Sequence, residues 1–439
     1  MKVDAYSVSR YNSLFPSHTA GFEGRYGGGY WTRHLGLWPG PRHTLEFANG
    51  TELVVETTAS LSMDGFENII DGNSLFQAAC LPDSDKGYVV PHPTPRGHPG
   101  STLPSTGPPS YPSPVLRHHN DLLRAYYLDE DEYQDTAVLQ LPTFKMDGEA
   151  PKEISLTAKE FIDQAIAMGK KRLIIDLSGN GGGDINVGFN IFRLLFPREN
   201  IETRTRFRAT EFIYLLGKVF SSDQARDKYE NFPLDLPLAA YLAVTPDQER
   251  SFGSWEELYG SGGNEETLLS EVYATFNFSS ASTESDPIEG YGTVVQTHVA
   301  QPFSTENIVM MTDGYCASTC AILADLLQGQ GVRSIVFGGR PRHAPMQLLG
   351  SVRGGQYWSL RTISRYASEA YGIAVQAAQA GNPILTAHEM EQYQDLMPPP
   401  AENFSLRFDV HGSSGVNFRN MYGEESGEIP LQFAFQPAD

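Results

Sequence analysis

Cysteine, basic residues and long hydrophobic runs are all scarce in this sequence. Its three cysteines are too few for a disulfide framework, and we expect Cys316 and Cys320 to be small packing residues rather than metal ligands. No run of about 18 apolar residues occurs, so no transmembrane helix is expected. Lysine and arginine number 32 against 53 aspartates and glutamates, and the net charge of −21 argues against a nucleic-acid partner.

Signals for a cell compartment are equally sparse. The segment Met1–Arg10 lacks the apolar stretch of a secretory signal. Three glycosylation sequons, at Asn49, Asn277 and Asn403, matter only if the protein enters the secretory pathway. The sequence therefore leaves the compartment open.

The 439 residues are enough for two structural units, and composition divides the chain further. Residues 1–80 form a β-rich N-terminal segment, with a predicted hairpin turning at Asn49-Gly50. Residues 81–130 form a Pro-rich linker. An α/β domain is expected over residues 131–345, with a C-terminal extension over residues 346–439 that packs on it.

Hydrophobic periodicity within the chain alternates between strand and helix. Strands are predicted at residues 136–142, 172–177 and 334–337, and helices at residues 156–170, 184–196, 211–219, 265–276 and 366–380. A further strand followed by a helix is predicted within residues 307–327. Repeated strand–helix–strand units of this spacing imply right-handed crossovers and a layered α/β fold.

Ser318 follows a strand and a tight turn, at the start of a predicted helix. A nucleophilic oxygen at this position gains from the free N–H groups and the dipole of the first helical turn. Serine is also a preferred N-cap residue, so a purely structural role is equally simple. The surroundings of Ser318 do not fit G-x-S-x-G, which argues against an α/β-hydrolase.

A glycine cluster, Gly181-Gly182-Gly183, follows the strand at 172–177. Without a Cβ, these residues allow backbone N–H groups to approach a reacting oxygen, as an oxyanion hole requires. The cluster does not fit a dinucleotide fingerprint, because Asp184 stands where glycine is needed, and it lacks the lysine of a P-loop. A simple turn into a helix is the alternative.

The two segments 176–183 and 312–321 together resemble serine peptidase family S41, the tail-specific or C-terminal-processing proteases. The resemblance is closest to fungal proteins similar to the chlamydial protease-like activity factor, some of which occur beside genes for ustiloxin- and phomopsin-type cyclic peptide toxins. It implies a ββα-repeat core of the crotonase/ClpP-like kind, a peptide substrate and no cofactor. It also implies that Ser318 is the nucleophile, with Gly181, Gly182 and Thr319 as the oxyanion donors.

The general base is the least determined part of this prediction. One branch of the family takes its base from a lysine about 25 residues after the serine, and here that position is His343. Histidine can serve as a base because its pKa lies near neutral pH. The other branch uses an upstream histidine, for which His118-His119 is a poor match, and a later glutamate, for which Glu369 has about the right spacing.

Three functions therefore follow from the sequence. The first is a serine endopeptidase acting through an acyl-enzyme, and the second is a peptide-binding relative with an incomplete catalytic set. In the second, a missing N-terminal region or a second chain could supply the base. The third is a crotonase-like acyl-CoA enzyme, which needs the oxyanion hole but no serine nucleophile.

Overall fold

The computed structural model describes fourteen stretches of the chain. They are residues 40–47, 49–56, 69–74, 111–146, 148–201, 203–229, 238–260, 269–274, 277–297, 300–338, 346–348, 356–398, 415–421 and 435–436. Most of the predicted Pro-rich linker lies outside them.

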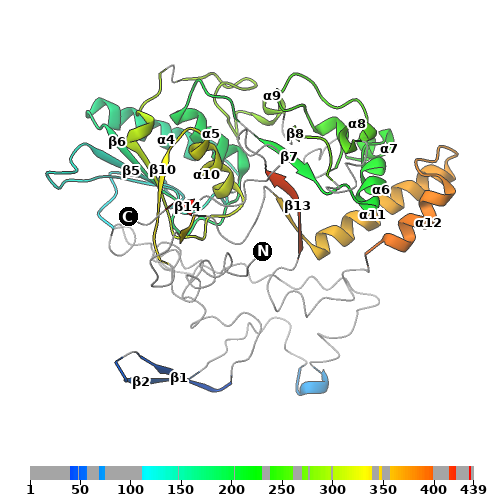
Figure 1. Ribbon diagram of the computed structural model, residues 1–439, viewed down its shortest axis with the longest axis horizontal. Helices are drawn as coiled ribbons and strands as arrows, with labels where there is room; N and C mark the ends of the chain where they lie inside the picture. Colours follow the sequence, from blue (N-terminus) through cyan, green and yellow to red (C-terminus); the bar gives the residue numbers. More distant parts are fainter. Residues whose placement is uncertain are drawn as a thin grey trace.

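A mixed six-stranded sheet in the order β10-β9-β6-β5-β4-β3 forms the centre of the α/β unit (Figure 1). Its strands are β3 (Leu116–Arg117), β4 (Arg124–Tyr127), β5 (Thr136–Gln140), β6 (Arg172–Asp176), β9 (Ile308–Thr312) and β10 (Arg333–Val336). Strands β5, β6, β9 and β10 are parallel, whereas β3 and β4 pair antiparallel at one edge. The carboxyl ends of β6 and β9 therefore lie side by side, and each leads into one of the two segments singled out in the sequence.

Helices connect the parallel strands and bury their apolar faces. They are α4 (Ala150–Ala167), α5 (Ile185–Leu195) and α10 (Thr319–Gly329), and α5 packs against both others. Leu139, Ile175 and Met310 stand beside one another on consecutive strands and are fully buried. Such burial explains why these strands read as nearly continuous apolar runs.

A second sheet, in the order β12-β13-β7-β8, joins the middle of the chain to its C-terminal part. Its strands are β7 (Arg204–Phe207), β8 (Tyr273–Ala274), β12 (Gln356–Ser359) and β13 (Gly415–Met421). Five helices lie near this sheet, on the right of Figure 1: α6 (Glu211–Phe220), α7 (Asp223–Lys228), α8 (Trp255–Tyr259), α11 (Leu360–Gln379) and α12 (Ala387–Leu396). They enclose a hydrophobic cluster separate from that of the central sheet, which includes Phe207, Phe220, Trp255 and Tyr393.

Smaller elements complete the fold. They are β1 (Arg42–Glu46), β2 (Glu52–Glu56), β11 (Met346–Gln347), β14 (Phe435–Gln436), α9 (Phe278–Ala281) and the 3₁₀ helices η3 (Ala240–Leu242) and η4 (Thr305–Asn307). Of the helices that the structure describes, none has both the length and the apolar character needed to cross a bilayer.

Most predicted elements of the α/β unit are confirmed, as is the hairpin of β1 and β2. The predicted helix at 265–276 is wrong where the structure describes it, because Tyr273 and Ala274 form β8 and pair with β7. Helix α4 starts six residues before the prediction, at Ala150, with Pro151 in its first turn. Proline is compatible with that position because its missing N–H would have no intrahelical partner there.

Candidate active site

Ser318 lies at the junction between β9 and α10, in an unusual backbone conformation. Its φ is +54° and its ψ −125°, and Ser318 is one of three non-glycine residues with positive φ in the described chain. Its side chain makes no capping hydrogen bond to α10. The N-cap role that the sequence left open is therefore not the one Ser318 has, and its Oγ is not committed to the helix. Non-glycine residues held in such conformations concentrate at active sites.

The start of α10 presents backbone donors beside this oxygen. The N–H of Thr319, the first helical residue, has no hydrogen-bond partner among the described residues. The carbonyl of Ser318 already accepts from Ile322 at 3.0 Å, so the helix is regular from its first residue. Free N–H groups and the helix dipole favour negative charge at this point.

The glycine loop after β6 packs directly against Ser318. A methyl group on Gly182 would lie 2.6 Å from the Cβ of Ser318 and 2.9 Å from the nitrogen of Thr319, so only glycine fits. Gly182 also has a φ of +92°, which disfavours any other residue. The side-chain hydroxyl of Thr319 donates to the carbonyl of Gly183 at 2.7 Å and ties the loop to the helix.

The three predicted oxyanion donors differ in their hydrogen bonding. The N–H of Gly182 donates to the side-chain oxygen of Asn180 at 2.8 Å and is therefore occupied. Within the described residues the N–H of Gly181 has no partner, like that of Thr319. Gly182 thus provides space for Ser318, and Gly181 and Thr319 are the two donors that remain available.

Two aspartates that the sequence analysis missed hold the loop and the turn in place. The carboxylate of Asp313 accepts from the N–H of Gly179 at 3.0 Å and from the N–H of Tyr315 at 3.1 Å, which bridges the two segments. Burial raises the pKa of Asp313, and the two backbone donors oppose that rise. Asp176 accepts from the N–H of Ser178 at 2.9 Å. Each aspartate stands at or just after the carboxyl end of a parallel strand, a position that could have identified both.

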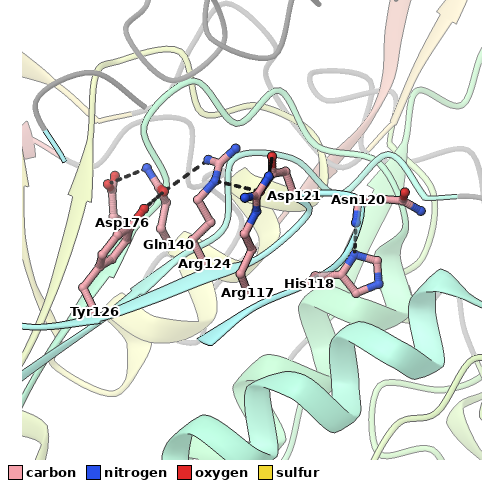
Figure 2. A network of polar contacts seen from close by, with 8 residues as sticks. All are labelled: Arg117, His118, Asn120, Asp121, Arg124, Tyr126, Gln140 and Asp176. Atoms are coloured by element: carbon pink, nitrogen blue, oxygen red, sulfur yellow. Dashed lines mark hydrogen bonds and ion pairs between the residues drawn. The ribbon is translucent and has the colours of Figure 1, made fainter. Parts of the chain in front are cut away.

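Asp176 is also the end of a polar network that crosses the sheet from its β3 edge (Figure 2). The Gln140 side chain donates to Asp176 at 3.3 Å, and its oxygen accepts from Arg124 at 3.3 Å and from Tyr126 at 3.0 Å. Arg124 in turn contacts Asp121 at 3.2 Å, and both are buried. Because every member is anchored to the next, the network fixes the orientation of the Asp176 carboxylate, which accepts from Ser178 at the start of the loop.

Tyrosines complete the surroundings of Asp176. The hydroxyl of Tyr111 donates to Asp176 at 2.7 Å, and burial followed by the charge of Asp176 raises the pKa of Tyr111. Burial likewise raises the pKa of Tyr126 to about 12. Both tyrosines therefore stay protonated and act as hydrogen-bond donors to this network at any ordinary pH.

The remaining predicted site residues are His343 and Glu369. His343 lies outside the described residues. Glu369 lies on α11 and accepts from the hydroxyl of Tyr229, which packs against the second hydrophobic cluster, at 2.6 Å. Within the described chain no contact joins Glu369 to Ser318, and the roles predicted for His343 and Glu369 stay predictions.

His118, His119 and Glu153 bring three possible metal-ligand atoms within 4.8 Å of one another. His118 is buried and its Nδ1 accepts from the N–H of Asn120 at 3.2 Å, so the neutral ring carries its proton on Nε2. That nitrogen lies 3.0 Å from the Glu153 carboxylate. The cluster is explained by a hydrogen bond between His118 and Glu153. The protonated Nε2 of His118 has no lone pair to offer, so His118 is not a metal ligand through that nitrogen.

The prediction that Cys316 and Cys320 are simple packing residues is wrong. Both are fully buried, as expected, but they form a disulfide. The turn before α10 brings their Cα atoms to 5.3 Å, a separation that a disulfide spans. Their spacing of four residues also suits two neighbours on one helix face, so spacing alone did not indicate a bond.

A carboxylate pair near the glycine loop provides a test of the local electrostatics. Burial, and then the charge of Asp184, raise the pKa of Asp286 to about 6. Asp184 itself caps α5 through the N–H of Val187, and burial raises its pKa too. Asp286 accepts from the side chain of Asn186 at 2.7 Å, a contact that an asparagine oxygen at position 286 could keep.

We expect Asp286→Asn to stabilise the protein near neutral pH but not in acid. The raised pKa means that folding favours the protonated form of Asp286. This contribution to the free energy of unfolding is fully present below the ordinary pKa of 3.8 and is lost as the pH rises through about 6, whereas uncharged asparagine loses nothing. After allowing for partial exposure, the gain is about 1 kcal/mol in the free energy of unfolding at pH 7.5. Urea unfolding of both proteins at pH 7.5 and pH 4 measures it, and an equal difference at the two pH values would contradict the assignment.

Comparisons with known proteins cover both segments of the candidate site, residues 176–183 and 312–321. The family model described as Peptidase family S41 matches residues 135–344, and a CPAF-like PDZ domain matches residues 7–66. The Peptidase S41 family protein ustP of Aspergillus flavus is 52% identical over 98% of this chain and 90% of its own length. The Peptidase S41 family protein phomP1' of Diaporthe leptostromiformis is 44% identical over 98% of this chain and 68% of its own.

Solved structures show a more distant likeness. Mature CPAF in complex with lactacystin is 15% identical, covers 72% of this chain with a TM-score of 0.31, and is itself covered over 58% of its length. The photosystem II D1 C-terminal processing protease is 13% identical, with a TM-score of 0.22 over 53% of this chain and 39% of its own. The mixed α/β sheet with its helices is consistent with the S41 protease fold. The identity to ustP, extending over nearly the whole of both chains and through both site segments, shows that this chain belongs to peptidase family S41.

Proposed function

We propose that this protein is a serine endopeptidase that cleaves peptide bonds through an acyl-enzyme on Ser318. The observation that carries the proposal is the conformation of Ser318: positive φ, no capping bond, and the backbone of Gly182 packed against its Cβ. A structural serine at a helix start would cap the helix instead. Family membership adds the reaction type, because S41 proteins are peptidases.

In the proposed reaction the Oγ of Ser318 attacks the peptide carbonyl while a base accepts its proton. The carbonyl oxygen becomes an oxyanion and receives hydrogen bonds from the N–H groups of Gly181 and Thr319, the two available donors. The intermediate collapses to an ester on Ser318 and releases the amine fragment, after which water hydrolyses the ester. We assign the base to His343, the histidine at the spacing where part of the family has lysine.

A peptide-cleavage assay with the His343→Ala variant tests that base. Purified wild-type chain is incubated with a pool of unstructured peptides, and products are followed by mass spectrometry. We expect cleavage by the wild type and a loss of about 10³-fold or more in His343→Ala, because an unactivated hydroxyl is a weak nucleophile. His388→Ala, which alters a histidine on α12, is the matched control and should keep wild-type rates. Equal rates for both variants would place the base elsewhere in the chain.

The substrate that we propose is a ribosomally made precursor peptide of a secondary metabolite. The relatives ustP and phomP1' are similar over 98% of this chain. The sequence itself resembles fungal proteins that occur beside genes for cyclic peptide toxins. In the organism that carries the gene, a Ser318→Ala allele should cause uncut precursor to accumulate, as measured by mass spectrometry of cell extracts. Unchanged amounts of mature fragments would contradict this substrate.

A further inference from the structure

The Cys316–Cys320 disulfide encloses the nucleophile. Cys316 lies in the turn after β9 and Cys320 in the first turn of α10, so Ser318 occupies the middle of a five-residue closed loop. Both cysteines are fully buried in the hydrophobic cluster of the central sheet. The covalent link therefore anchors both ends of the loop to the core.

Ser318 differs from three other hydroxyl residues that precede α-helices in the described part of the chain. Thr210, Ser222 and Ser254 all have extended backbones, with φ of −86°, −76° and −152°, and each accepts a hydrogen bond from the N–H three residues later. That is the ordinary conformation of a capping hydroxyl residue. Ser318 has the opposite sign of φ and makes no such bond, so something must keep it from capping α10.

The loop closure explains what prevents capping. For Ser318 to adopt the extended conformation, the backbone on either side of it would have to rotate while Cys316 and Cys320 stay joined with their Cα atoms 5.3 Å apart. Within the same loop, the carbonyl of Ala317 accepts a hydrogen bond from the N–H of Cys320 at 3.1 Å, which further restricts the backbone before Ser318. The backbone of Gly182 adds a steric wall but forms no bond to Ser318.

We propose that the Cys316–Cys320 disulfide is a positioning element for the nucleophile, which holds Ser318 uncapped and reactive. The inference rests on the proposed role of Ser318 as nucleophile. When a dithiol reduces the bond, two electrons and two protons convert it to two thiols, and the dithiol becomes a cyclic disulfide. Ser318 then relaxes to an extended backbone, and its Oγ accepts from the N–H of Ala321.

The first measurement establishes the bond itself. Protein purified without any reductant is denatured and alkylated with iodoacetamide, with and without prior reduction, and weighed intact. The chain has three cysteines, so we expect one alkylation, at Cys80, before reduction and three after it. Three alkylations without reduction would overturn the proposal.

The second measurement separates positioning from folding. Labelling by a fluorophosphonate gives an inactivation rate constant and a separate inhibitor affinity, both measured well below the melting temperature. In the Cys316→Ala/Cys320→Ala variant we expect the rate constant to fall about tenfold or more, because a misplaced nucleophile reacts slowly, while the affinity changes less than about twofold. Cys80→Ser, which leaves the disulfide intact, should match the wild type. An unchanged rate constant in the double variant would overturn the proposal.

A crystal structure of the double variant provides a readout that does not depend on activity. A negative φ at Ser318 with its Oγ on the N–H of Ala321 is expected, and a retained positive φ would contradict the role of the disulfide. If oxidised wild-type protein fails to label at all, the proposed peptidase activity fails. Even in that case, the sign of φ at Ser318 in the variant shows whether the disulfide sets the backbone conformation of Ser318.

Discussion

Ser318→Ala should reduce peptide hydrolysis by about 10⁴-fold or more, the largest effect that we expect from any single substitution. The loss follows from removing the atom that forms the acyl-enzyme, while the proposed oxyanion donors remain. Substrate affinity should change little, because Oγ makes no contact with α10 that its removal would disturb. The measurement compares kcat and KM for a cleaved peptide.

Two controls make that result specific. The melting temperature of Ser318→Ala should stay within a few degrees of the wild type, because a hydroxyl that caps nothing contributes little to helix stability. Ser222→Ala removes a serine that does cap its helix, α7, and should lower the melting temperature while leaving catalysis unchanged. A Ser318→Ala protein that retained wild-type kcat would exclude Ser318 as the nucleophile.

Gly182→Ala should slow acylation by about 10²- to 10³-fold, although it removes no reacting atom. The added methyl group would lie 2.6 Å from both the carbonyl oxygen of Ala317 and the Cβ of Ser318, distances that atoms do not tolerate. The φ of +92° adds backbone strain for alanine. Either Ser318 or the glycine loop must shift to avoid the methyl group. Both shifts change the position of the Ser318 Oγ relative to the proposed oxyanion donors.

Gly181→Ala is the matched control for that substitution. Its methyl group would meet the ring of the exposed Tyr315 at 3.2 Å, and that ring can shift by a few tenths of an ångström. The N–H of Gly181 is kept in the variant, so acylation should stay within a few-fold of the wild type. Both variants are compared by fluorophosphonate labelling rate and by melting temperature. Equal losses in the two would mean that the loop responds to any side chain rather than to contact with Ser318.

The parallel part of the fold was predictable because its physical signals are local. Strands β6 and β9 are buried runs with flanking turns, and α5 begins at Asp184, which caps it, and ends before Pro197. Strand β8 was not predictable, since Tyr273 and Ala274 pair with residues far away in the sequence: Arg204 and Thr205 of β7, and Val244. Local sequence carries no record of such a partner.

The candidate site likewise has parts that local sequence indicates and parts that depend on distant contacts. Ser318 and the glycine cluster were identified from sequence, because a nucleophile turn and an oxyanion loop each need distinctive residues over a few positions. The disulfide was missed because spacing of four residues suits both a helix face and a covalent bridge. The support from Asp313 to Gly179 joins segments that only the sheet brings together. From the sequence, Ser318 could be a helix cap or a nucleophile. Its backbone angles and the absence of a capping hydrogen bond argue against the cap.

The measurement that tests this account most directly is the location of a covalent adduct. Wild-type protein is labelled with a fluorophosphonate, digested and mapped by tandem mass spectrometry. We predict a single modified serine at Ser318, formed at a rate well above that of free serine and absent after prior denaturation. Modification of other serines in preference to Ser318, or labelling that survives denaturation, would contradict the assignment of this junction as the acylation centre.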